Sequence, residues 1–400
     1  MTRTHLFLLL VLMVGVSVPE WGQGINYNES KIPDYTLPDP LVFENGRRVR
    51  NARQWTRKRR PEVLEVFSSQ MFGHIPSVPE GLHFELIAQE SVYDGLGVRK
   101  TVRAWLDAKE EHWFDIMVHV PSHHRKPVPM MAFINFYGNE DTCDPTNPKR
   151  TPYEMILGSG FGAATVWRDE IEPDKPDSSG KGVRSWFNIG GDWGAISAWA
   201  WALSRVLDYL ETDSDVDASK IAVLGHSRLG KTALWAGAND RRFAIVISNC
   251  SGCCGAAISR RRIGENFEWI ASHFPHWFCP AFQQYKGREE SFPADQHWLT
   301  ALMAPRPLYI ASGSEDHWAD PRGEWLCAVN TVPVYALFGL NGLSGTVMPE
   351  VNTPDMEGEI AYHVHEGKHG LTPYDWKNYL RFSARHFEVE VPRIDGGPSM

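Results

Sequence analysis

Five short apolar runs that do not alternate with polar residues constrain the fold of this 400-residue chain more than any other feature. The runs are residues 130–136, 163–167, 221–224, 243–247 and 307–311. Such runs suit strands that are covered on both faces, as in a parallel sheet between layers of helices. Segments with helical spacing lie between them, and residues 193–210 (WGAISAWAWALSRVLDYL) are the most apolar of these. The alternation predicts a mostly parallel α/β sheet with right-handed crossovers.

Three further segments complete the predicted architecture. Residues 100–107 and 113–120 alternate between apolar and polar positions, which predicts a hairpin at the edge of the sheet. Residues 61–71 follow the basic stretch WTRKRR and predict an amphipathic helix. Its expected role is packing and capping of the domain. The chain contains no internal repeat. We therefore predict a single domain over residues 25–400, with a central sheet covered by helices on both faces as a three-layer sandwich.

The first 24 residues have the pattern of a secretory signal peptide. Arg3 precedes an apolar run over residues 6–18, and small and polar residues follow it. The run is shorter than the roughly 20 residues that cross a bilayer. We therefore expect residues 1–24 to be removed and the product to be secreted or periplasmic, with no membrane contact afterwards. A retained membrane anchor is the alternative.

Charge and cysteine content exclude several classes of protein. The chain has 40 Lys and Arg against 49 Asp and Glu, a net charge of −9, which argues against a nucleic-acid partner. Six cysteines are too sparse for a disulfide framework, and they lack the doubled C-x-x-C spacing of a zinc site. Cys250, Cys253 and Cys254 share one loop, and their pairing stays open. We expect a monomer without cofactor or metal.

The segment IAVLGHSRLGKTALWAGA predicts a strand, a sharp turn at Ser227 and a helix. A nucleophile elbow has this context, because small residues on both sides let the turn close and leave the Ser oxygen exposed at the helix N-terminus. The usual spacing is G-x-S-x-G, whereas Gly230 here falls one position later. A plain strand–helix connection is the alternative. On a sheet of this type, an acid and then a His follow the Ser in the chain.

The acid is expected in the loop after residues 307–311, since ligand chemistry gathers at the carboxyl ends of parallel strands. Glu315, Asp316 and Asp320 all lie in this loop, and at least two of them must be ordinary loop charges.

The base is expected after the last strand, where EIAYHVHEGKHG supplies His363, His365 and His369. His369 is flanked by glycines in a loop and is the best placed of the three, whereas His363 and His365 suit a polar pair on one strand face. A metal site from this HxHxxxH spacing is a weak alternative. A Ser hydroxyl is a poor nucleophile at neutral pH unless a His accepts its proton and a carboxylate orients that His.

Two cations, Arg228 and Lys231, lie within four residues of Ser227. They suggest a substrate that carries or develops negative charge. The backbone N–H of Arg228 is expected to stabilise the oxyanion, together with a group from the loop of Tyr137, Gly138 and Asn139.

The motifs GHSRLGK, SNCSGCCG, GSEDHWADP and GKHGLTPYDW together resemble the bacterial glucuronoyl esterases, carbohydrate esterase family 15. The similarity runs over residues 61–387. It implies an α/β-hydrolase that cleaves the ester between 4-O-methyl-glucuronic acid of glucuronoxylan and lignin alcohols. The resemblance makes Ser227 the nucleophile, His369 the base and Arg228 an oxyanion stabiliser through its main chain and side chain.

The same resemblance implies three residues that bind the sugar. Lys231 is expected to contact the ring, Glu265 in RRIGENFEW to bind its hydroxyls, and Trp318 in EDHWADP to pack on its C–H face.

This chain departs from the family pattern at two places. Many members carry the catalytic carboxylate at the position of Cys250, and a thiol cannot neutralise an imidazolium. The resemblance therefore moves the role to Asp316, with Glu315 as the alternative. Fungal members have a Cys pair where this chain has His226 and Gly370, so that bridge is absent.

Two other functions stay open at the level of the sequence. The first is an acetyl xylan or cinnamoyl esterase on the same fold. The second is a non-catalytic protein that binds glucuronoxylan without turnover.

Overall fold

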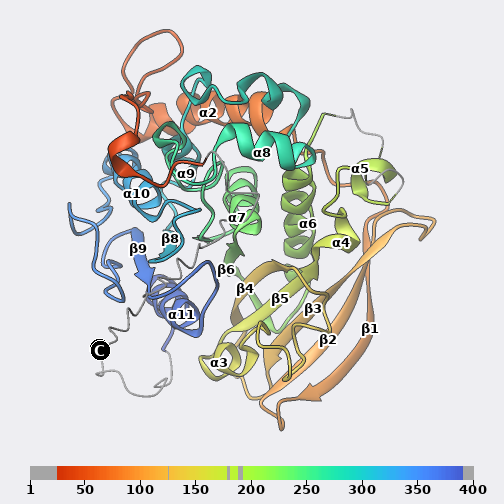
Figure 1. Cartoon of the computed structure of the whole chain (residues 1–400). Helices are drawn as coiled ribbons and strands as arrows, with labels where there is room; N and C mark the ends of the chain where they lie inside the picture. The colour runs from red at the N-terminus through yellow and green to blue at the C-terminus, as the bar shows by residue number, and fades with distance from the viewer. Residues whose placement is uncertain (1–24, 125, 178–180, 188–191, 391–400) are drawn as a thin grey trace, which may run out of the picture.

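A computed structural model describes residues 25–124, 126–177, 181–187 and 192–390, so the predicted signal peptide lies outside the described residues. Nine strands form one sheet in the order β1-β2-β3-β5-β4-β6-β7-β8-β9 (Figure 1). The strands are β1 (His83–Val92), β2 (Gly97–Trp105), β3 (Trp113–Pro121), β4 (Val128–Asn135), β5 (Gly162–Trp167), β6 (Val216–His226), β7 (Ile245–Asn249), β8 (Leu308–Gly313) and β9 (Ile360–His365).

The neighbouring strands from β5 to β9 run parallel to one another, and β1, β2 and β3 run antiparallel to their neighbours. All five apolar runs form parallel strands, and the side chains of β4 and β7 are buried throughout. The mostly parallel α/β sheet is therefore confirmed. Unbroken apolar runs formed buried strands because both faces of this part of the sheet are covered.

The prediction that the hairpin of β2 and β3 forms the edge of the sheet is wrong. β1 pairs with β2 on the outside and is the true edge strand. Its side chains are exposed along nearly the whole strand, including Leu86 and Ile87. A strand open to solvent on both faces has no pattern of alternating burial, so the sequence carried no signal for it.

Helices cover both faces of the sheet (Figure 1). One buried apolar cluster includes residues of α6, α7 and α10, and the other includes residues of α3 and α11. The α-helices are α1 (Ala52–Gln54), α2 (Arg60–Phe67), α3 (Tyr153–Gly158), α4 (Arg168–Ile171), α5 (Val183–Trp186), α6 (Ala195–Leu210), α7 (Arg228–Asn239), α8 (Phe267–His273), α9 (Gln296–Ala301), α10 (Pro321–Ala336) and α11 (Pro373–Phe387). Short helical turns are η2 (Glu29–Lys31), η3 (Trp55–Arg59), η4 (Ser68–Phe72), η5 (Ser259–Arg261), η6 (Pro275–Trp277), η7 (Pro280–Tyr285) and η8 (Glu289–Ser291).

The helix expected over residues 61–71 is longer than the sequence predicted. A continuous helical segment runs from Ala52 to Phe72, with π turns at η3 and η4. The Asn51 side chain caps its start by accepting a hydrogen bond from the backbone N–H of Gln54. The basic stretch therefore forms the first half of the helix instead of preceding it.

Neither a membrane-crossing helix nor a disulfide is present in the described part of the chain. No helix of the described residues is long and apolar enough to span a bilayer. All six cysteines are free thiols, and five of them are buried.

Candidate active site

Ser227 lies at the junction of β6 and α7 with a φ of 59°, a backbone conformation that L-residues rarely adopt. A Cβ atom on Gly225 would lie 1.8 Å from the carbonyl oxygen of Leu229, and one on Gly230 would lie 2.9 Å from Cβ of Ser251. Both positions therefore exclude side chains. The elbow closes with its second glycine one residue later than usual, because residue 230 is the one that packs against Ser251.

The elbow presents Ser227 at the N-terminus of α7. Ser227 is the N-cap and Arg228 the first helical residue, so the backbone N–H of Arg228 has no acceptor within the helix. The helix dipole adds partial positive charge at this end. Negative charge that develops beside Ser227 would therefore be stabilised by this N–H.

His369 and Asp316 form a close pair next to Ser227. The Nδ1 atom of His369 lies 2.6 Å from Oδ2 of Asp316, which is buried in the loop after β8. Glu315 is exposed, and its backbone N–H donates to the carbonyl of Gly367. The structure therefore places Asp316, and not Glu315, against the histidine.

The third acid of this loop has a structural role. Asp320 pairs with Arg261 at 2.7 Å and caps α10 by accepting a hydrogen bond from Gly323.

No hydrogen bond joins Ser227 Oγ to His369 among the described residues. Ser227 and His369 nevertheless both line two neighbouring cavities, one of about 560 Å³ and one of about 440 Å³. Hydrogen bonds of this kind often tighten only once substrate is bound.

His226, the residue before Ser227, packs against the ring of His369. Its ring centroid lies 4.6 Å from that of His369, and its Nδ1 atom lies 2.6 Å from Oδ1 of Asn249. Burial, followed by the nearby charge of His369, lowers the pKa of His226 to about 3. His226 therefore stays neutral at neutral pH.

His363 and His365 are more than a polar pair on a strand face. Both are buried and bind the same oxygen of Asp375, with distances of 2.7 Å from Nε2 of His363 and 2.9 Å from Nδ1 of His365. The other oxygen of Asp375 accepts hydrogen bonds from the backbone N–H and the hydroxyl of Thr372. The second ring nitrogen of His365 lies 3.1 Å from the carbonyl of Lys368. This network therefore fixes both ends of the loop that carries His369.

The same three side chains could in principle hold a metal, since their ligand atoms lie within 4.8 Å of one another. The remaining ring nitrogen of His363 lies 2.8 Å from the Tyr309 hydroxyl. Because each ring nitrogen and both carboxylate oxygens have protein partners, the arrangement fits a structural hydrogen-bond network.

Replacing Asp375 with Asn should destabilise the fold by about 2–4 kcal/mol, because the amide cannot accept hydrogen bonds from His363, His365 and Thr372 together. Burial would raise the pKa of Asp375, but the hydrogen bonds from both histidines hold it well below its ordinary value of 3.8. Its stabilising contribution is therefore full above pH about 4 and is lost as the pH falls toward the folded-state pKa.

Urea unfolding from pH 7 down to pH 3 tests this prediction. The variant should lose less stability on acidification than the wild-type protein. Asp141→Asn, at an exposed carboxylate, serves as the control and should leave both stability and its pH dependence nearly unchanged. Equal behaviour of the two variants would contradict the assigned network.

Asp174, which the sequence did not indicate, positions Arg228. Its buried carboxylate lies 2.5 Å from Nη1 of Arg228 and 2.8 Å from Nη1 of Arg168, and it binds His276 and Trp277. Burial would raise the pKa of Asp174, but the His276 hydrogen bond and the Arg228 charge outweigh it and hold that pKa well below its ordinary value. The guanidinium of Arg228 also lies 4.6 Å from the Trp277 ring centroid. Arg228 is therefore held beside Ser227 by a permanently charged partner.

Lys231 and Glu265 form a buried ion pair one helical turn from Ser227. The Lys231 ammonium lies 2.8 Å from a Glu265 oxygen and donates at 2.7 Å to the carbonyl of Ser251. Both side chains are more than nine-tenths buried. The residues that the sequence linked to sugar binding are thus in contact with each other.

A cavity of about 560 Å³ brings the predicted residues together. All seven line it: Ser227, Arg228, Lys231, Glu265, Asp316, Trp318 and His369. Its wall also contains aromatic residues of the segment FEWIASHFPHWF that the sequence analysis passed over, namely Trp269, His273, Phe274 and Trp277. Trp269 meets Trp318 edge to face at 4.5 Å. The density of aromatic residues in that segment was the signal that could have revealed this wall.

A second cavity of about 440 Å³ lies on another side of Ser227 and shares Arg228 and His369 with the first. Phe136 and Tyr137 are among the residues that line it. Two donors of the loop from Tyr137 to Asn139, where a second oxyanion donor is expected, have partners within the protein. The N–H of Gly138 donates to Asn135 at 2.9 Å, and the side-chain amide of Asn139 donates to the carbonyl of Asp115 at 2.8 Å.

Cys250 lies where a carboxylate would be expected, and it is a buried thiol 3.7 Å from the carbonyl of Gly370. Burial, followed by the charge of Glu324, raises the pKa of Cys250 well above its ordinary value, so the thiol stays neutral. Glu324 accepts hydrogen bonds from the backbone N–H groups of Ser251 and Gly252. Burial raises the pKa of Glu324 to about 8. Glu324, which the sequence did not indicate, thereby anchors the loop that follows Cys250.

Comparisons with known proteins relate this chain to esterases. A family model described as "Glucuronyl esterase, fungi" matches residues 106–339. A curated carbohydrate esterase from an unknown prokaryotic organism is 40% identical, over 96% of this chain and 99% of its own length. A 4-O-methyl-glucuronoyl methylesterase 1 of Wolfiporia cocos is 28% identical, over 80% of this chain and 76% of its own.

Two solved structures are similar over most of their length. The glucuronoyl esterase from Solibacter usitatus has a TM-score of 0.83 and 40% identity, covering 88% of this chain and 98% of its own. A promiscuous CE15 esterase from a marine bacterial metagenome has a TM-score of 0.82 and 40% identity, covering 91% of this chain and all of its own.

An elbow serine on a mostly parallel sheet, with an acid–histidine pair at the same sheet edge, defines an α/β-hydrolase. Within that class, this chain belongs to the glucuronoyl esterases of carbohydrate esterase family 15. It is therefore a carboxylic ester hydrolase, as its resemblance to that family implied.

Proposed function

We propose that this enzyme hydrolyses the ester between 4-O-methyl-glucuronic acid of glucuronoxylan and alcohol groups of lignin, through a Ser-His-Asp acyl-enzyme mechanism. The observation that carries the proposal is the 2.6 Å contact between His369 and Asp316, in the wall of a cavity that Ser227 and the Lys231–Glu265 pair also line. Several relatives are named 4-O-methyl-glucuronoyl methylesterases. A fungal enzyme of the same fold is described in complex with methyl 4-O-methyl-β-D-glucopyranuronate.

In the acylation step, Ser227 Oγ attacks the carbonyl carbon of the uronate ester while its proton passes to Nε2 of His369. Asp316 holds the Nδ1–H of the ring and stabilises the imidazolium that forms. The oxyanion lies within reach of the Arg228 backbone N–H and its guanidinium group. The tetrahedral intermediate then collapses, the C–O bond to the alcohol breaks, and His369 returns the proton to the leaving alkoxide.

In the deacylation step, water attacks the acyl-enzyme while His369 accepts one of its protons. Ser227 leaves with that proton, and free glucuronate is the product. The two steps use the side chains of this cavity, the backbone N–H of Arg228 and water.

The polar end of the larger cavity suits the sugar. Glu265 has a second carboxylate oxygen besides the one bound to Lys231, and it would accept hydrogen bonds from ring hydroxyls. Trp318 offers an indole against the C–H face of the ring. Since the ester is uncharged, we assign Lys231 to ring hydroxyls and Arg228 to the developing oxyanion.

The smaller cavity suits the alcohol. Because His369 must protonate the leaving oxygen, the alcohol has to lie on a side of Ser227 that His369 also reaches, and the smaller cavity shares both residues. Phe136 and Tyr137 give it an aromatic lining, and about two-fifths of the Tyr137 side chain is exposed. An aryl alcohol of the lignin type would stack there.

We also propose that residues 1–24 are removed as a signal peptide. Residues 25–400 then act as one secreted or periplasmic catalytic domain, and as a monomer. Mass spectrometry of the exported protein, together with light scattering, tests both points. An uncleaved N-terminus or a dimer would contradict them.

Rates on four esters test the substrate assignment. The value of kcat/KM should be highest for benzyl glucuronate, lower for methyl glucuronate, and lower still for acetylated xylan and methyl cinnamate. We expect roughly tenfold or more between the glucuronates and the other two, because only a uronate meets Lys231 and Glu265. Absence of a preference for glucuronates would instead indicate an acetyl xylan or cinnamoyl esterase. Binding of glucuronoxylan with no turnover of any ester would indicate a non-catalytic protein.

A further inference from the structure

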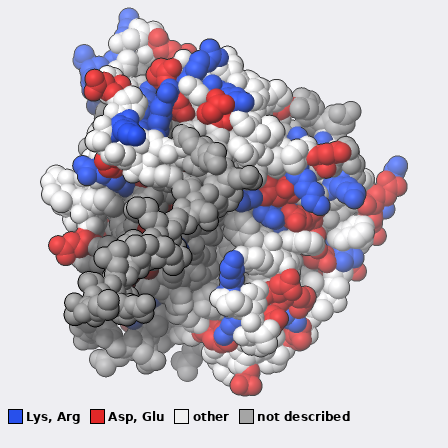
Figure 2. Space-filling model, viewed as in Figure 1, with Lys and Arg blue, Asp and Glu red and all other residues white. Residues whose placement is uncertain are grey.

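Residues 47–60 form the most basic segment of the chain. Eight of these residues are Lys or Arg and none is Asp or Glu, in a protein of net charge −9. Two of the eight, Arg59 and Arg60, are buried, and the other six are exposed or partly exposed side chains. Figure 2 shows several Lys and Arg side chains, with acidic ones among them, at the upper left, where Figure 1 places the N-terminal segment beside α2. The active-site mechanism uses none of these cations.

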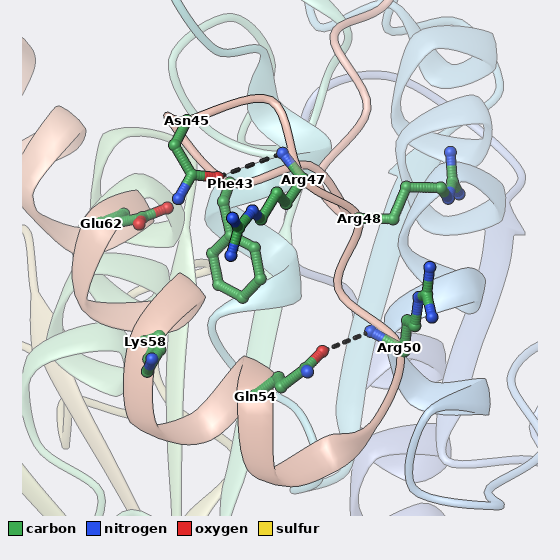
Figure 3. A pocket seen from close by; sticks show the side chains of 8 residues that line it. All are labelled: Phe43, Asn45, Arg47, Arg48, Arg50, Gln54, Lys58 and Glu62. Atoms are coloured by element: carbon green, nitrogen blue, oxygen red, sulfur yellow. Dashed lines mark hydrogen bonds between the residues drawn. The ribbon is translucent and has the colours of Figure 1, made fainter.

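A cavity of about 530 Å³ opens between the loop of residues 43–50 and the first half of the helical segment, residues 54–62. Figure 3 shows its lining residues: Phe43, Asn45, Arg47, Arg48 and Arg50 from the loop, and Gln54, Lys58 and Glu62 from the helical segment. It shares no residue with either cavity at Ser227.

Most of the positive charge on this cavity wall has no carboxylate partner in the part of the chain that the structure describes. Glu62, the one acid of the wall, pairs with buried Arg59 at 2.9 Å. Arg48 pairs with Asp39 at 3.0 Å. Within the described residues, no carboxylate lies within 4.0 Å of the other three cations of the wall, Arg47, Arg50 and Lys58.

The backbone that carries these cations is held by hydrogen bonds. The N–H of Phe43 donates to the carbonyl of Arg47 at 2.8 Å, and Val42 and Arg48 form a β-bridge. The side-chain carbonyl oxygens of Asn45 and Gln54 accept from the backbone N–H groups of Arg47 and Arg50. The backbone of the cavity wall is therefore fixed before any ligand arrives, so its ordering adds no entropic cost to binding.

The same hydrogen bonds leave two amide groups of the wall available as donors. Because Asn45 and Gln54 use their carbonyl oxygens, their NH₂ groups remain as donors, and neither donates to another described residue. Phe43 adds an aromatic ring to the wall. Three unpaired cations, two amide donors and one ring are the groups that recognise a carboxylated sugar.

We propose that this cavity is a second binding site, for acidic polysaccharide, which binds unesterified uronate carboxylates of the polymer on which the enzyme acts. The choice of a uronate polymer rests on the proposed function, whereas the anion-binding character of the cavity does not. Ester groups are neutral and the free acids beside them are charged, so the cavity would distinguish the polymer from neutral glycans. Its action would be to keep the enzyme on the chain between cleavages.

A sparsely charged polymer fits this surface better than nucleic acid or an anionic membrane. Charges further apart than about 8 Å are largely screened at physiological salt, so the cavity acts on carboxylates that enter it. The remaining surface is net negative and repels a dense array of phosphates that would contact it as well.

The test compares the full-length enzyme with the triple variant Arg47→Gln/Arg50→Gln/Lys58→Gln, by affinity electrophoresis or calorimetry. Glucuronoxylan and the same xylan with its carboxyl groups reduced are the ligands. We expect roughly tenfold weaker binding of glucuronoxylan by the variant and weaker wild-type binding at high salt, with the reduced xylan unaffected. Hydrolysis of benzyl glucuronate, a small substrate, should be unchanged.

The matched control is Lys109→Gln/Lys126→Gln/Arg322→Gln, which removes the same charge from exposed residues that line neither this cavity nor those at Ser227. If the triple variant does not fold, the single changes at Arg50 and Lys58 replace it. The proposal is overturned if both triple variants lose binding equally, if neither loses it, or if only anionic phospholipid vesicles or RNA compete at this site. Failure of the esterase function would appear separately, as absence of benzyl glucuronate hydrolysis with binding intact.

Discussion

Ser227→Ala is expected to lower kcat/KM for benzyl glucuronate by about 10⁴- to 10⁶-fold, because the methyl side chain has no oxygen to form the acyl-enzyme. The cavity, Arg228 and His369 remain, so substrate should still bind. Residual turnover would come only from binding and oxyanion stabilisation. Steady-state rates measure the loss. The enzyme concentration has to be determined by a method that does not depend on activity. An activity within tenfold of the wild-type value would exclude Ser227 as the nucleophile.

The control for this variant has to separate chemistry from folding. Ser227 has a φ of 59°, so Ala at this position is strained to about the same degree as Ser. Thermal unfolding of the variant should therefore be close to that of the wild-type protein. Ser219→Ala, an exposed Ser on the same strand, should retain full activity. Loss of activity in both variants would point to a general defect of β6.

The sequence was sufficient to predict the parallel strands and the elbow, because both depend on local patterns. The run IAVLGHS contains the second half of β6 and its turn within seven residues, and glycines nearby allow the strained conformation at Ser227. The chain order of the fold predicts an acid after β8 and a histidine after β9. It leaves three acids open in the loop after β8, and the family resemblance selects Asp316 among them. The 2.6 Å contact between His369 and Asp316 agrees with that selection.

The residues that hold the site in place could not be predicted, because their partners are remote in the chain. Asp174 and Arg228 are in contact although 54 positions separate them in the sequence, and 73 positions separate Glu324 from Ser251. A single carboxylate in a loop carries no local sign of such a partner. The edge strand β1 was missed for a different reason, since its residues are exposed on both faces.

The ionic partners of the two cations beside Ser227 change what these cations indicate about the substrate. From the sequence, Arg228 and Lys231 suggested a substrate with negative charge. In the structure Asp174 and Glu265 neutralise them, so the cavity is far less cationic than the sequence suggested. Paired cations remain good hydrogen-bond donors, which suits an uncharged ester whose oxyanion appears only during reaction.

Asp316→Asn is the second variant with a large expected effect, a fall in kcat of about 10³- to 10⁴-fold with little change in KM. The Asp316 carboxylate accepts the Nδ1–H of His369 and leaves Nε2 free for the Ser227 proton. An amide can present N–H to the ring and favour the wrong tautomer, and it does not stabilise the imidazolium. Because Asp316 does not contact the sugar in this mechanism, binding should persist while turnover is lost.

Glu315→Gln is the matched control, since it removes the neighbouring charge from an exposed side chain. We expect it to retain kcat within about twofold, because an exposed charge near the site acts weakly through solvent. Rates on benzyl glucuronate for both variants, with unfolding curves to show that each is folded, decide the assignment. If Glu315→Gln loses turnover and Asp316→Asn keeps it, the catalytic acid is Glu315 instead of Asp316. The assignment of the protein as an esterase would not change. Full activity in both variants would mean that His369 works without either carboxylate, against the 2.6 Å contact on which the proposed mechanism depends.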